Sequence, residues 1–328
     1  MTALSTTNVW VLTDSKAGHK NQCLGLASAL GVEPVVKHLS PGFPWSKLPP
    51  QLWFNPLRAA YPDGSQLQPP WPNLVIAAGR QTVAPALAIK RASAGQTFLV
   101  QVQDPVSRRD RFDVIAAPRH DELTGGNVIQ TSGALTGISE AALTDAGEHF
   151  ADILATLPRP LVAVLVGGSN GKYRMTERAT TDLAAGLQRL SGDYGAGLAI
   201  TASRRTGEEN EARLRGGLAG TAWWFWDGQG DNPYLGLLAL ADAVVVTADS
   251  VSMVSDACST GKPVYVAELE GGSGKFDRFH SCLRNQGMTR TFDGTLDSWT
   301  YDALCDTEYV AEEVIRRYAE FASARAAS

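Results

Sequence analysis

Short apolar runs alternate with longer segments of mixed polarity along most of this chain. The runs are rich in Val, Leu and Ala and predict buried strands at Val9–Leu12, Val35–His38, Leu74–Ala78, Thr97–Val102, Asp113–Ala116, Asn127–Gln130, Leu161–Val166, Leu198–Ala202, Thr221–Trp226, Ala243–Val246 and Val264–Ala267. The segments between them predict helices at Gln22–Leu30, Val83–Arg91, Asp182–Leu190, Thr206–Gly217 and Pro233–Ala241. Almost fully apolar strands separated by helices are typical of parallel, doubly wound sheets.

The alternation of strands and helices occurs twice, on either side of a proline-containing segment at residues 154–160. A chain of 328 residues is too long for one ordinary core. We therefore predict an α/β protein with two Rossmann-like domains, residues 1–155 and 156–328, that face each other across a cleft. The amphipathic tail from Glu308 to Ala327 predicts a last helix that packs back on the N-terminal domain.

Composition narrows the class of protein further. Hydrophobic residues make up 44% of the chain and charged residues 19%, as in soluble globular proteins. The net charge of −5 does not favour nucleic acid as a partner. The beginning of the chain has no basic, apolar leader pattern, and the four cysteines show no paired spacing, so we expect reduced thiols and a cytoplasmic location. The histidines lack metal-ligand spacing, which predicts no metal site.

The segment Ala241–Val266 gives the clearest chemical signal. It predicts a strand, a polar turn, a helix that ends before Gly261, and a second strand. Ser250 or Ser252 can cap the helix, and the first-turn amides from Ser250 to Met253, Val251 included, suit a phosphate. Asp256, one turn into the helix, is placed to bind a sugar hydroxyl beside that phosphate. The pattern predicts a nucleoside diphosphate site.

A glycine-rich turn, Gly167-Gly168-Ser169-Asn170-Gly171, follows the strand Leu161–Val166. Glycines allow a close backbone approach to phosphate, and Ser169 and Asn170 offer side-chain hydrogen bonds. A plain turn explains the same residues. The spacing before Lys172 excludes a P-loop. The turn also satisfies G-x-S-x-G, so a serine hydrolase with Ser169 as nucleophile, Asp249 or Asp256, and His280 remains an alternative.

Polar residues that follow strands in the first half of the chain are predicted to contact the substrate. Ligands collect at the carboxyl ends of parallel strands, where Asp14, Gly18 and His19 follow the first strand and Arg80 the third. We predict His19 or Asp104 as general base and Arg80 as an anion clamp. A solvated histidine and a turn-capping aspartate are the plain alternatives.

Two further segments of the second half are candidates for nucleotide contacts. Arg204 or Arg205, after the strand Leu198–Ala202, can supply positive charge to a diphosphate, or can be solvated beside a helix cap. The aromatic run Trp223–Trp226 predicts mainly core packing, and Trp226 can also stack beside a nucleobase.

These residues resemble the nucleotide-sugar half of GT-B glycosyltransferases, above all the enzyme that adds N-acetylglucosamine to a lipid-linked peptidoglycan precursor. The resemblance rests on Gly-Gly-Ser-Asn-Gly at 167–171 and on the stretch 241–263. By position it implies the roles already given to Ser250–Met253 and Asp256, and a place near the reacting centre for Gly18 and His19. The first loop departs from that family, because residues 14–17 replace a glycine run.

The chain is also similar, over most of residues 8–307, to bacterial members of the ELM family, which is named for plant mitochondrial fission factors. The shared runs are Asp14-Ser-Lys-Ala-Gly-His, Ala78-Gly-Arg, Gln103-Asp-Pro, Gly230-Asp-Asn-Pro-Tyr and Thr247-Ala-Asp-Ser-Val-Ser-Met. The resemblance implies a GT-B-like fold. It implies no defined reaction, and plant relatives act by recruiting a dynamin-like protein.

The sequence thus predicts a metal-independent transfer of sugar from a nucleotide-sugar donor, with UDP favoured, to an acceptor that the sequence does not identify. The nucleotide sugar is a co-substrate, and no other cofactor is expected. A non-catalytic scaffold of the ELM family is the main alternative. A protein partner or a peripheral membrane contact is compatible with either function.

Overall fold

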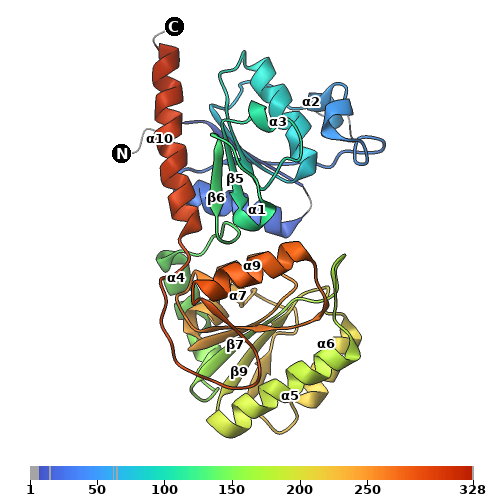
Figure 1. Ribbon diagram of the computed structural model, residues 1–328, viewed down its shortest axis with the longest axis vertical. Coiled ribbons are helices and arrows are strands. Elements are labelled where there is room, and N and C mark those ends of the chain that lie inside the picture. Colours follow the sequence, from blue (N-terminus) through green and yellow to red (C-terminus); the bar gives the residue numbers. More distant parts are fainter. Residues whose placement is uncertain (1–6, 15, 62, 64–65, 327–328) are drawn as a thin grey trace. The chain divides into compact units, whose positions relative to one another are not determined.

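The helices and strands of the chain form two compact units (Figure 1). The computed structural model describes residues 7–14, 16–61, 63 and 66–326. The first unit comprises the described residues up to Gly137 and from Cys305 onward, and the second comprises Ile138–Leu304. The sequence placed the boundary at 155/156, but helix α4 (Glu140–Leu154) contacts α7 (Tyr234–Leu240) and belongs to the second unit.

The first unit is built on a six-stranded parallel sheet in the order β2-β1-β3-β4-β5-β6. Its strands are β1 (Val9–Thr13), β2 (Val35–His38), β3 (Leu74–Ala78), β4 (Phe98–Val102), β5 (Val114–Pro118) and β6 (Val128–Thr131). Its helices are α1 (Ala17–Ala29), α2 (Pro56–Ala59), α3 (Arg80–Ala92) and α10 (Asp306–Ala326), with short 3-10 turns at Pro50–Leu52, Arg109–Arg111 and Arg119–Asp121.

Helices cover both faces of this sheet, so its central strands β1, β3, β4 and β5 are buried at every residue, whereas the edge strand β2, predicted to be buried, is partly exposed. Val9 and Val11 pack with residues of α1 and α10, and Trp10 and Leu12 pack with residues of α3 on the other face. Helix α10 lies along this unit (Figure 1). Its Phe321 ring lies 5.2 Å from the ring of Phe98. Ala327, part of the predicted tail helix, lies outside the described residues.

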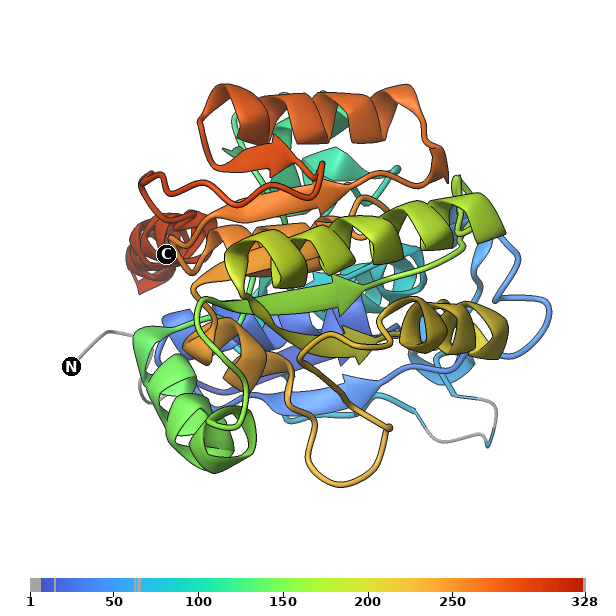
Figure 2. The ribbon, with the colours of Figure 1, turned by 90° about the horizontal axis from the view of Figure 1, so that it is seen from below.

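The second unit contains another six-stranded parallel sheet, in the order β10-β9-β7-β11-β12-β14. Its strands are β7 (Leu161–Val166), β9 (Gly197–Ala202), β10 (Trp223–Phe225), β11 (Ala243–Thr247), β12 (Val264–Ala267) and β14 (Thr289–Thr291). A small antiparallel pair joins β8 (Tyr173–Arg174) to β13 (Glu270–Gly271). The remaining helices are α5 (Glu177–Tyr194), which crosses in front of the strands in Figure 2, α6 (Glu208–Gly217), α8 (Val251–Cys258) and α9 (Gly274–Asn285).

The order of strands reverses once in each sheet, and the reversal marks where ligands bind in such folds. In the first unit the chain leaves β1 for β2 on one side and reaches β3 on the other. In the second unit β7 and β11 are the neighbouring strands at the reversal. The crevice at the carboxyl ends of such strands is the general ligand site of open α/β sheets. The predicted doubly wound, two-unit fold is confirmed.

Candidate functional site

The glycine-rich turn after β7 lies against the turn after β11. A Cβ atom at Gly167 would overlap the carboxylate of Asp249, and one at Gly168, whose φ is +148°, would overlap the backbone carbonyl of Arg205. Only glycine permits these approaches. The Gly167 N–H donates to Thr247 Oγ1 over 2.7 Å, and the Asn170 side chain donates to the Asp249 carbonyl over 3.1 Å. The two turns therefore form one structure at the β7/β11 reversal.

Asp249 is the centre of this structure, and the sequence had suggested it only as a partner in a hydrolase. Its side chain is fully buried and accepts hydrogen bonds from Thr247 Oγ1 (2.7 Å) and the Gly168 N–H (3.1 Å). It also forms an ion pair with Arg205 (2.9 Å). Burial raises the pKa of Asp249, and the Thr247 hydrogen bond and the Arg205 charge partly offset that rise. The carboxylate holds the glycine-rich turn in place.

Helix α8 begins beside this turn and has the features of an anion site. Ser250 is its N-cap, with Oγ accepting from the Met253 N–H over 3.3 Å, so Val251, Ser252 and Met253 form the first turn. No acidic side chain lies in that turn. The positive end of the helix dipole and the glycine-rich turn therefore lie at the same edge of the sheet.

The two arginines after β9 have different roles in the structure. Arg205 is the partner of Asp249, whereas Arg204 is exposed and has no ion-pair partner within the described ranges. Arg204 is thus the arginine of this turn that remains available to an anionic ligand. Sequence could not separate the two neighbours, because packing decides which side chain points inward.

The serine hydrolase interpretation is wrong on geometric grounds. A nucleophile elbow joins a strand to a helix, but the turn after β7 continues into strand β8. Ser169 Oγ accepts a hydrogen bond from the Met175 N–H over 3.0 Å. His280, the required base, donates from Nε2 to the Ala248 carbonyl over 2.9 Å. Ser169 therefore helps to shape the turn.

Asp256 lies on α8, where its Oδ2 accepts a hydrogen bond from the Tyr234 hydroxyl of α7 over 2.8 Å. Burial raises the pKa of Asp256 to about 7, against the lowering effect of that hydrogen bond. Asp256, the residue predicted to bind the ribose, thus already has one carboxylate oxygen bonded to Tyr234. Its other oxygen is Oδ1.

This raised pKa predicts a pH-dependent stability. The folded chain binds more protons than the unfolded chain between the normal pKa of Asp, about 4, and the pKa of Asp256 in the folded protein, so the free energy of unfolding contributed by Asp256 falls as pH rises to about 7. Asp256→Asn removes this ionisation and should gain stability relative to the wild type as pH rises. Urea unfolding at pH 5 and pH 8 measures the difference, with the exposed Asp182→Asn as control. An unchanged pH dependence in Asp256→Asn would contradict the assignment.

Trp226 follows the edge strand β10, two strands away from β7. Its indole N–H donates to the Gln229 carbonyl over 2.8 Å. It lines a cavity of about 380 Å³ with Phe150, His149 and Asp231. No described contact links Trp226 to the glycine-rich turn, so its predicted stacking on a base remains a prediction.

A polar cavity of about 380 Å³ lies at the ends of β11 and β12. It is lined by charged and aromatic side chains, among them Tyr173, Glu268, Asp277, His280 and Arg290. Two atoms from its lining residues, His280 Nδ1 and Thr289 Oγ1, are buried and have no hydrogen-bond partner within the described part of the chain. Burial lowers the pKa of His280, which favours the neutral ring. Such a lining fits a small molecule with several hydroxyl groups.

In the first unit, the β1/β3 reversal holds an aspartate–histidine pair. His19, in the first turn of α1 next to Gly18, bonds through Nδ1 to Asp14 Oδ1 over 2.9 Å, and both side chains are largely buried. Burial opposes ionisation of Asp14, but the hydrogen bonds from His19 and the Lys16 N–H bring its pKa below the usual value. Gly79, with φ +87°, packs against the pair, and a Cβ there would lie 2.5 Å from His19 Nδ1.

This pair has the geometry of an oriented general base. A carboxylate on Nδ1 fixes the imidazole and leaves Nε2 to take a proton. The sequence predicted Asp14 and His19 as separate candidates on a loop, but α1 already begins at Ala17 and brings them together. Ser15, in the same predicted loop, lies outside the described residues.

Two other predicted residues of the first unit are engaged by their surroundings. Arg80 donates to the backbone carbonyls of Ser46 (3.0 Å) and Leu48 (3.4 Å), which ties the 46–48 segment to α3. Asp104 forms a bidentate ion pair with Arg109 (2.8 and 2.6 Å) and accepts the Val106 N–H. A carboxylate with these partners is a poor base, so His19 is the better of the two catalytic candidates.

Comparison with known proteins gives the family. The family model described as mitochondrial fission ELM1 matches residues 17–318. The mitochondrial fission protein ELM1 of Arabidopsis thaliana is 36% identical over 275 residues, which cover 76% of this chain. The chain belongs to the mitochondrial fission ELM1 family. This ELM1-family protein spans 64% of the length of the plant relative. The uncharacterized protein RP120 of Rickettsia prowazekii (strain Madrid E) is 26% identical over 351 residues, covering 93% of this chain and 97% of its own length.

Solved structures similar to this ELM1-family protein share its fold. A putative UDP-N-acetylglucosamine 2-epimerase from Listeria monocytogenes matches with a TM-score of 0.56 at 11% identity, over 96% of this chain and 97% of that one. The UDP-GlcNAc 2-epimerase from Methanocaldococcus jannaschii matches with a TM-score of 0.53 at 11% identity, over 94% and 98%. The match covers both units and confirms the GT-B-like fold.

The described residues of this ELM1-family protein lack two features that other α/β proteins can have. No helix there has the length and apolar character needed to cross a bilayer. No group of three or more His, Cys, Asp or Glu side chains within the described ranges has the geometry to bind a metal ion.

Proposed function

We propose that this protein binds a nucleoside diphosphate sugar, with UDP favoured, and transfers the sugar to a hydroxyl acceptor. The observation that carries the proposal is the position of the glycine-rich turn and the start of α8, which flank the β7/β11 reversal. The diphosphate would bind between the glycine-rich turn, where the Gly171 N–H has no hydrogen-bond partner among the described residues, and the first turn of α8. Arg204 would supply positive charge, and Asp256 Oδ1 would accept a ribose hydroxyl.

The sugar and the acceptor hydroxyl would have polar partners as well. The cavity at the ends of β11 and β12 would take the sugar, whose hydroxyls satisfy His280 Nδ1 and Thr289 Oγ1. His19, oriented by Asp14, would deprotonate the acceptor hydroxyl, while the dipole of α8 and Arg204 stabilise the leaving diphosphate without a metal ion. The similar solved structures named above are a UDP-GlcNAc 2-epimerase and a putative one, which supports a nucleotide sugar as ligand in a general sense.

A non-catalytic scaffold is the second candidate, and two observations favour it. Four of the five N–H groups of the glycine-rich turn already donate within the protein: Gly167 to Thr247, Gly168 to Asp249, and Ser169 and Asn170 to the backbone carbonyls of Arg205 and Tyr173. The plant relative is named for mitochondrial fission, not for a transfer reaction. A scaffold would keep the fold and bind nucleotides weakly or not at all.

A thermal-shift screen against UDP-, GDP-, ADP- and CMP-sugars separates the two functions. Ligand that binds only the folded protein raises the melting temperature by mass action, with about 2.7 kcal/mol gained at one hundred times the dissociation constant. We expect UDP-sugars to raise the melting temperature most, and Arg204→Ala to reduce the shift, whereas the exposed Arg178→Ala should not. No shift with any nucleotide sugar would favour the scaffold.

A further inference from the structure

The most exposed large hydrophobic side chains of the described residues are concentrated in the first unit. Phe43, Val106, Phe54 and Leu52 are 84%, 69%, 67% and 61% exposed, respectively. Three of the four lie on one segment, residues 43–54, where the rings of Trp45 and Phe54 are 5.3 Å apart. Single exposed apolar residues are normal, but a cluster of this kind marks an interaction surface.

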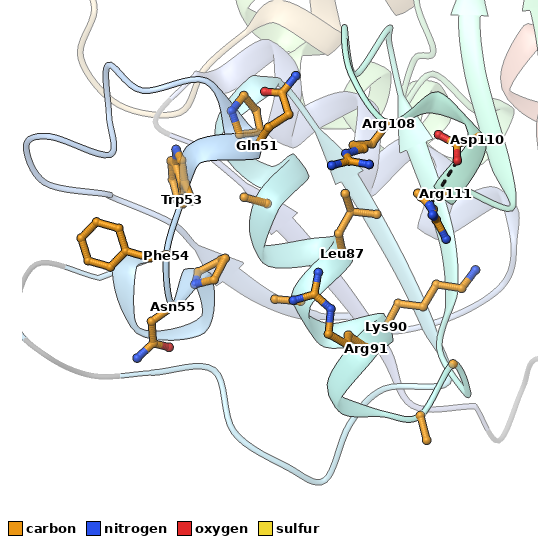
Figure 3. Close-up of a pocket in the computed structure, with 16 residues that line it drawn as sticks. Gln51, Trp53, Phe54, Asn55, Leu87, Lys90, Arg91, Arg108, Asp110 and Arg111 are labelled. Atoms are coloured by element: carbon orange, nitrogen blue, oxygen red, sulfur yellow. Dashed lines mark ion pairs between the residues drawn. The ribbon is translucent and has the colours of Figure 1, made fainter.

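A cavity of about 950 Å³ lies beside this segment (Figure 3). It is bounded by residues 50–56, by α3 from Ala84 to its end, and by Arg108–Arg111. Its position is separate from the β1/β3 reversal, because it includes the C-terminal half of α3 and the turn at residues 94–95, whereas Asp14 and His19 lie at the carboxyl ends of the strands.

The walls of this cavity are strongly basic in a chain whose net charge is negative. Among the described residues that line it, the cations are Lys90, Arg91, Arg108 and Arg111, and the one carboxylate is that of Asp110. Lys90 pairs with Asp113, and Arg111 with Asp110. Arg91 and Arg108 are exposed and have no ion-pair partner among the described residues. Two unpaired guanidinium groups therefore remain for an anionic ligand.

Apolar side chains line the same cavity as these two cations. Figure 3 shows the guanidinium groups of Arg91 and Arg108 on either side of Leu87, with Trp53 and Phe54 on the opposite wall. A second cavity of about 460 Å³ shares Phe54 and is also lined by Arg58 and Trp45. The Trp45 indole N–H is buried and has no hydrogen-bond partner within the described residues. Phosphate and ester oxygens would accept hydrogen bonds from the two guanidinium groups and from the indole N–H.

We propose that this face of the first unit docks on a bilayer that contains anionic phospholipid. Arg91 and Arg108 bind the headgroup phosphate in the cavity, and Phe43, Leu52 and Phe54 enter the interface between headgroups and acyl chains. Projecting apolar side chains combined with cations on one face are the features of interfacial membrane binding. An acidic soluble partner would explain the arginines but not side chains as exposed as Phe43.

Co-sedimentation with vesicles tests this proposal independently of nucleotide binding. The full chain should bind vesicles of phosphatidylcholine mixed with phosphatidylglycerol, bind pure phosphatidylcholine much less, and dissociate as salt is raised. Arg91→Gln with Arg108→Gln should lower the partition coefficient by roughly tenfold or more, since each cation at the surface contributes about 1 kcal/mol. Leu52→Ser with Phe54→Ser should lower it to a similar extent.

Matched double variants in the second unit serve as controls. Arg178→Gln with Arg213→Gln removes the same charge, and Ile153→Ser with Tyr194→Ser removes exposed apolar surface; neither should change vesicle binding. Equal binding to neutral and anionic vesicles, or normal binding by either first-unit variant, would overturn the proposal. So would displacement by inorganic phosphate combined with no effect of Leu52→Ser with Phe54→Ser, because that result identifies a small-anion site only. Nucleotide-sugar thermal shifts of the same variants should remain as in the wild type.

Discussion

Asp249→Ala is expected to lower the free energy of unfolding by about 3 kcal/mol, the scale for losing one partner of a buried charged network. The substitution leaves the Gly168 N–H and the Arg205 guanidinium without their shared acceptor. It also removes the carboxylate against which the glycine-rich turn packs. Urea unfolding followed by circular dichroism measures the loss.

Two further variants make the Asp249 result interpretable. Asp249→Asn keeps the shape and one acceptor oxygen, so its loss should be smaller, and it can be measured even where Asp249→Ala does not fold. Asp182→Ala removes an exposed carboxylate that lies 3.6 Å from Arg178, and should cost less than about 1 kcal/mol. Equal effects of Asp249→Ala and Asp182→Ala would show that Asp249 is not the anchor.

His19→Ala is expected to reduce the rate of sugar transfer, or of donor hydrolysis without acceptor, by about 10²–10⁴-fold, the usual contribution of a positioned general base. Asp14→Asn should reduce the rate strongly as well, because an amide cannot hold the imidazole as the carboxylate does over 2.9 Å. Release of UDP from the best ligand of the thermal-shift screen provides the assay.

Two controls show whether the effect of His19→Ala is specific. One is the nucleotide affinity of that variant, and the other is a variant at an exposed histidine. His19→Ala should leave the dissociation constant of the nucleotide nearly unchanged, because His19 is not among the proposed donor contacts. His149→Ala replaces an exposed histidine that pairs with Asp231, and should have full activity. If His19→Ala turns over like the wild type, another group is the base.

The sequence predicted the central strands of both sheets well because they are buried on both faces and mostly apolar. It missed the short, polar edge strand β14. Predicted strands such as Leu161–Val166 and Val264–Ala267 have the observed bounds. Helices were harder. Helices α4 and α9 were not predicted: α4 ends at Leu154, where the predicted linker begins, and α9 begins in the glycine-rich run at residues 271–274. Capping by Ser139, whose hydroxyl accepts the Ala142 N–H, is the signal that could have located α4.

The sequence predicted where along the chain the site residues lie, but not which of them contact each other. The sequence placed Asp14, His19, the glycine-rich turn and Ser250 at strand ends, which follows from the parallel fold. It could not show that His19 meets Asp14, since that pairing depends on where α1 begins. It also gave no reason to choose Asp249 as the anchor, because a buried carboxylate is recognised only by its partners.

Amide hydrogen exchange with and without a UDP-sugar tests the central claim most directly. We predict that the ligand slows exchange in two separate stretches of the second unit, Gly167–Gly171 and Ser250–Met253, because a diphosphate bound between them covers both turns and holds their hydrogen bonds closed. Peptides from β10 and α5 serve as internal references. Ligand binding that leaves both stretches unprotected, or protects only residues elsewhere, would contradict a diphosphate site at the β7/β11 reversal.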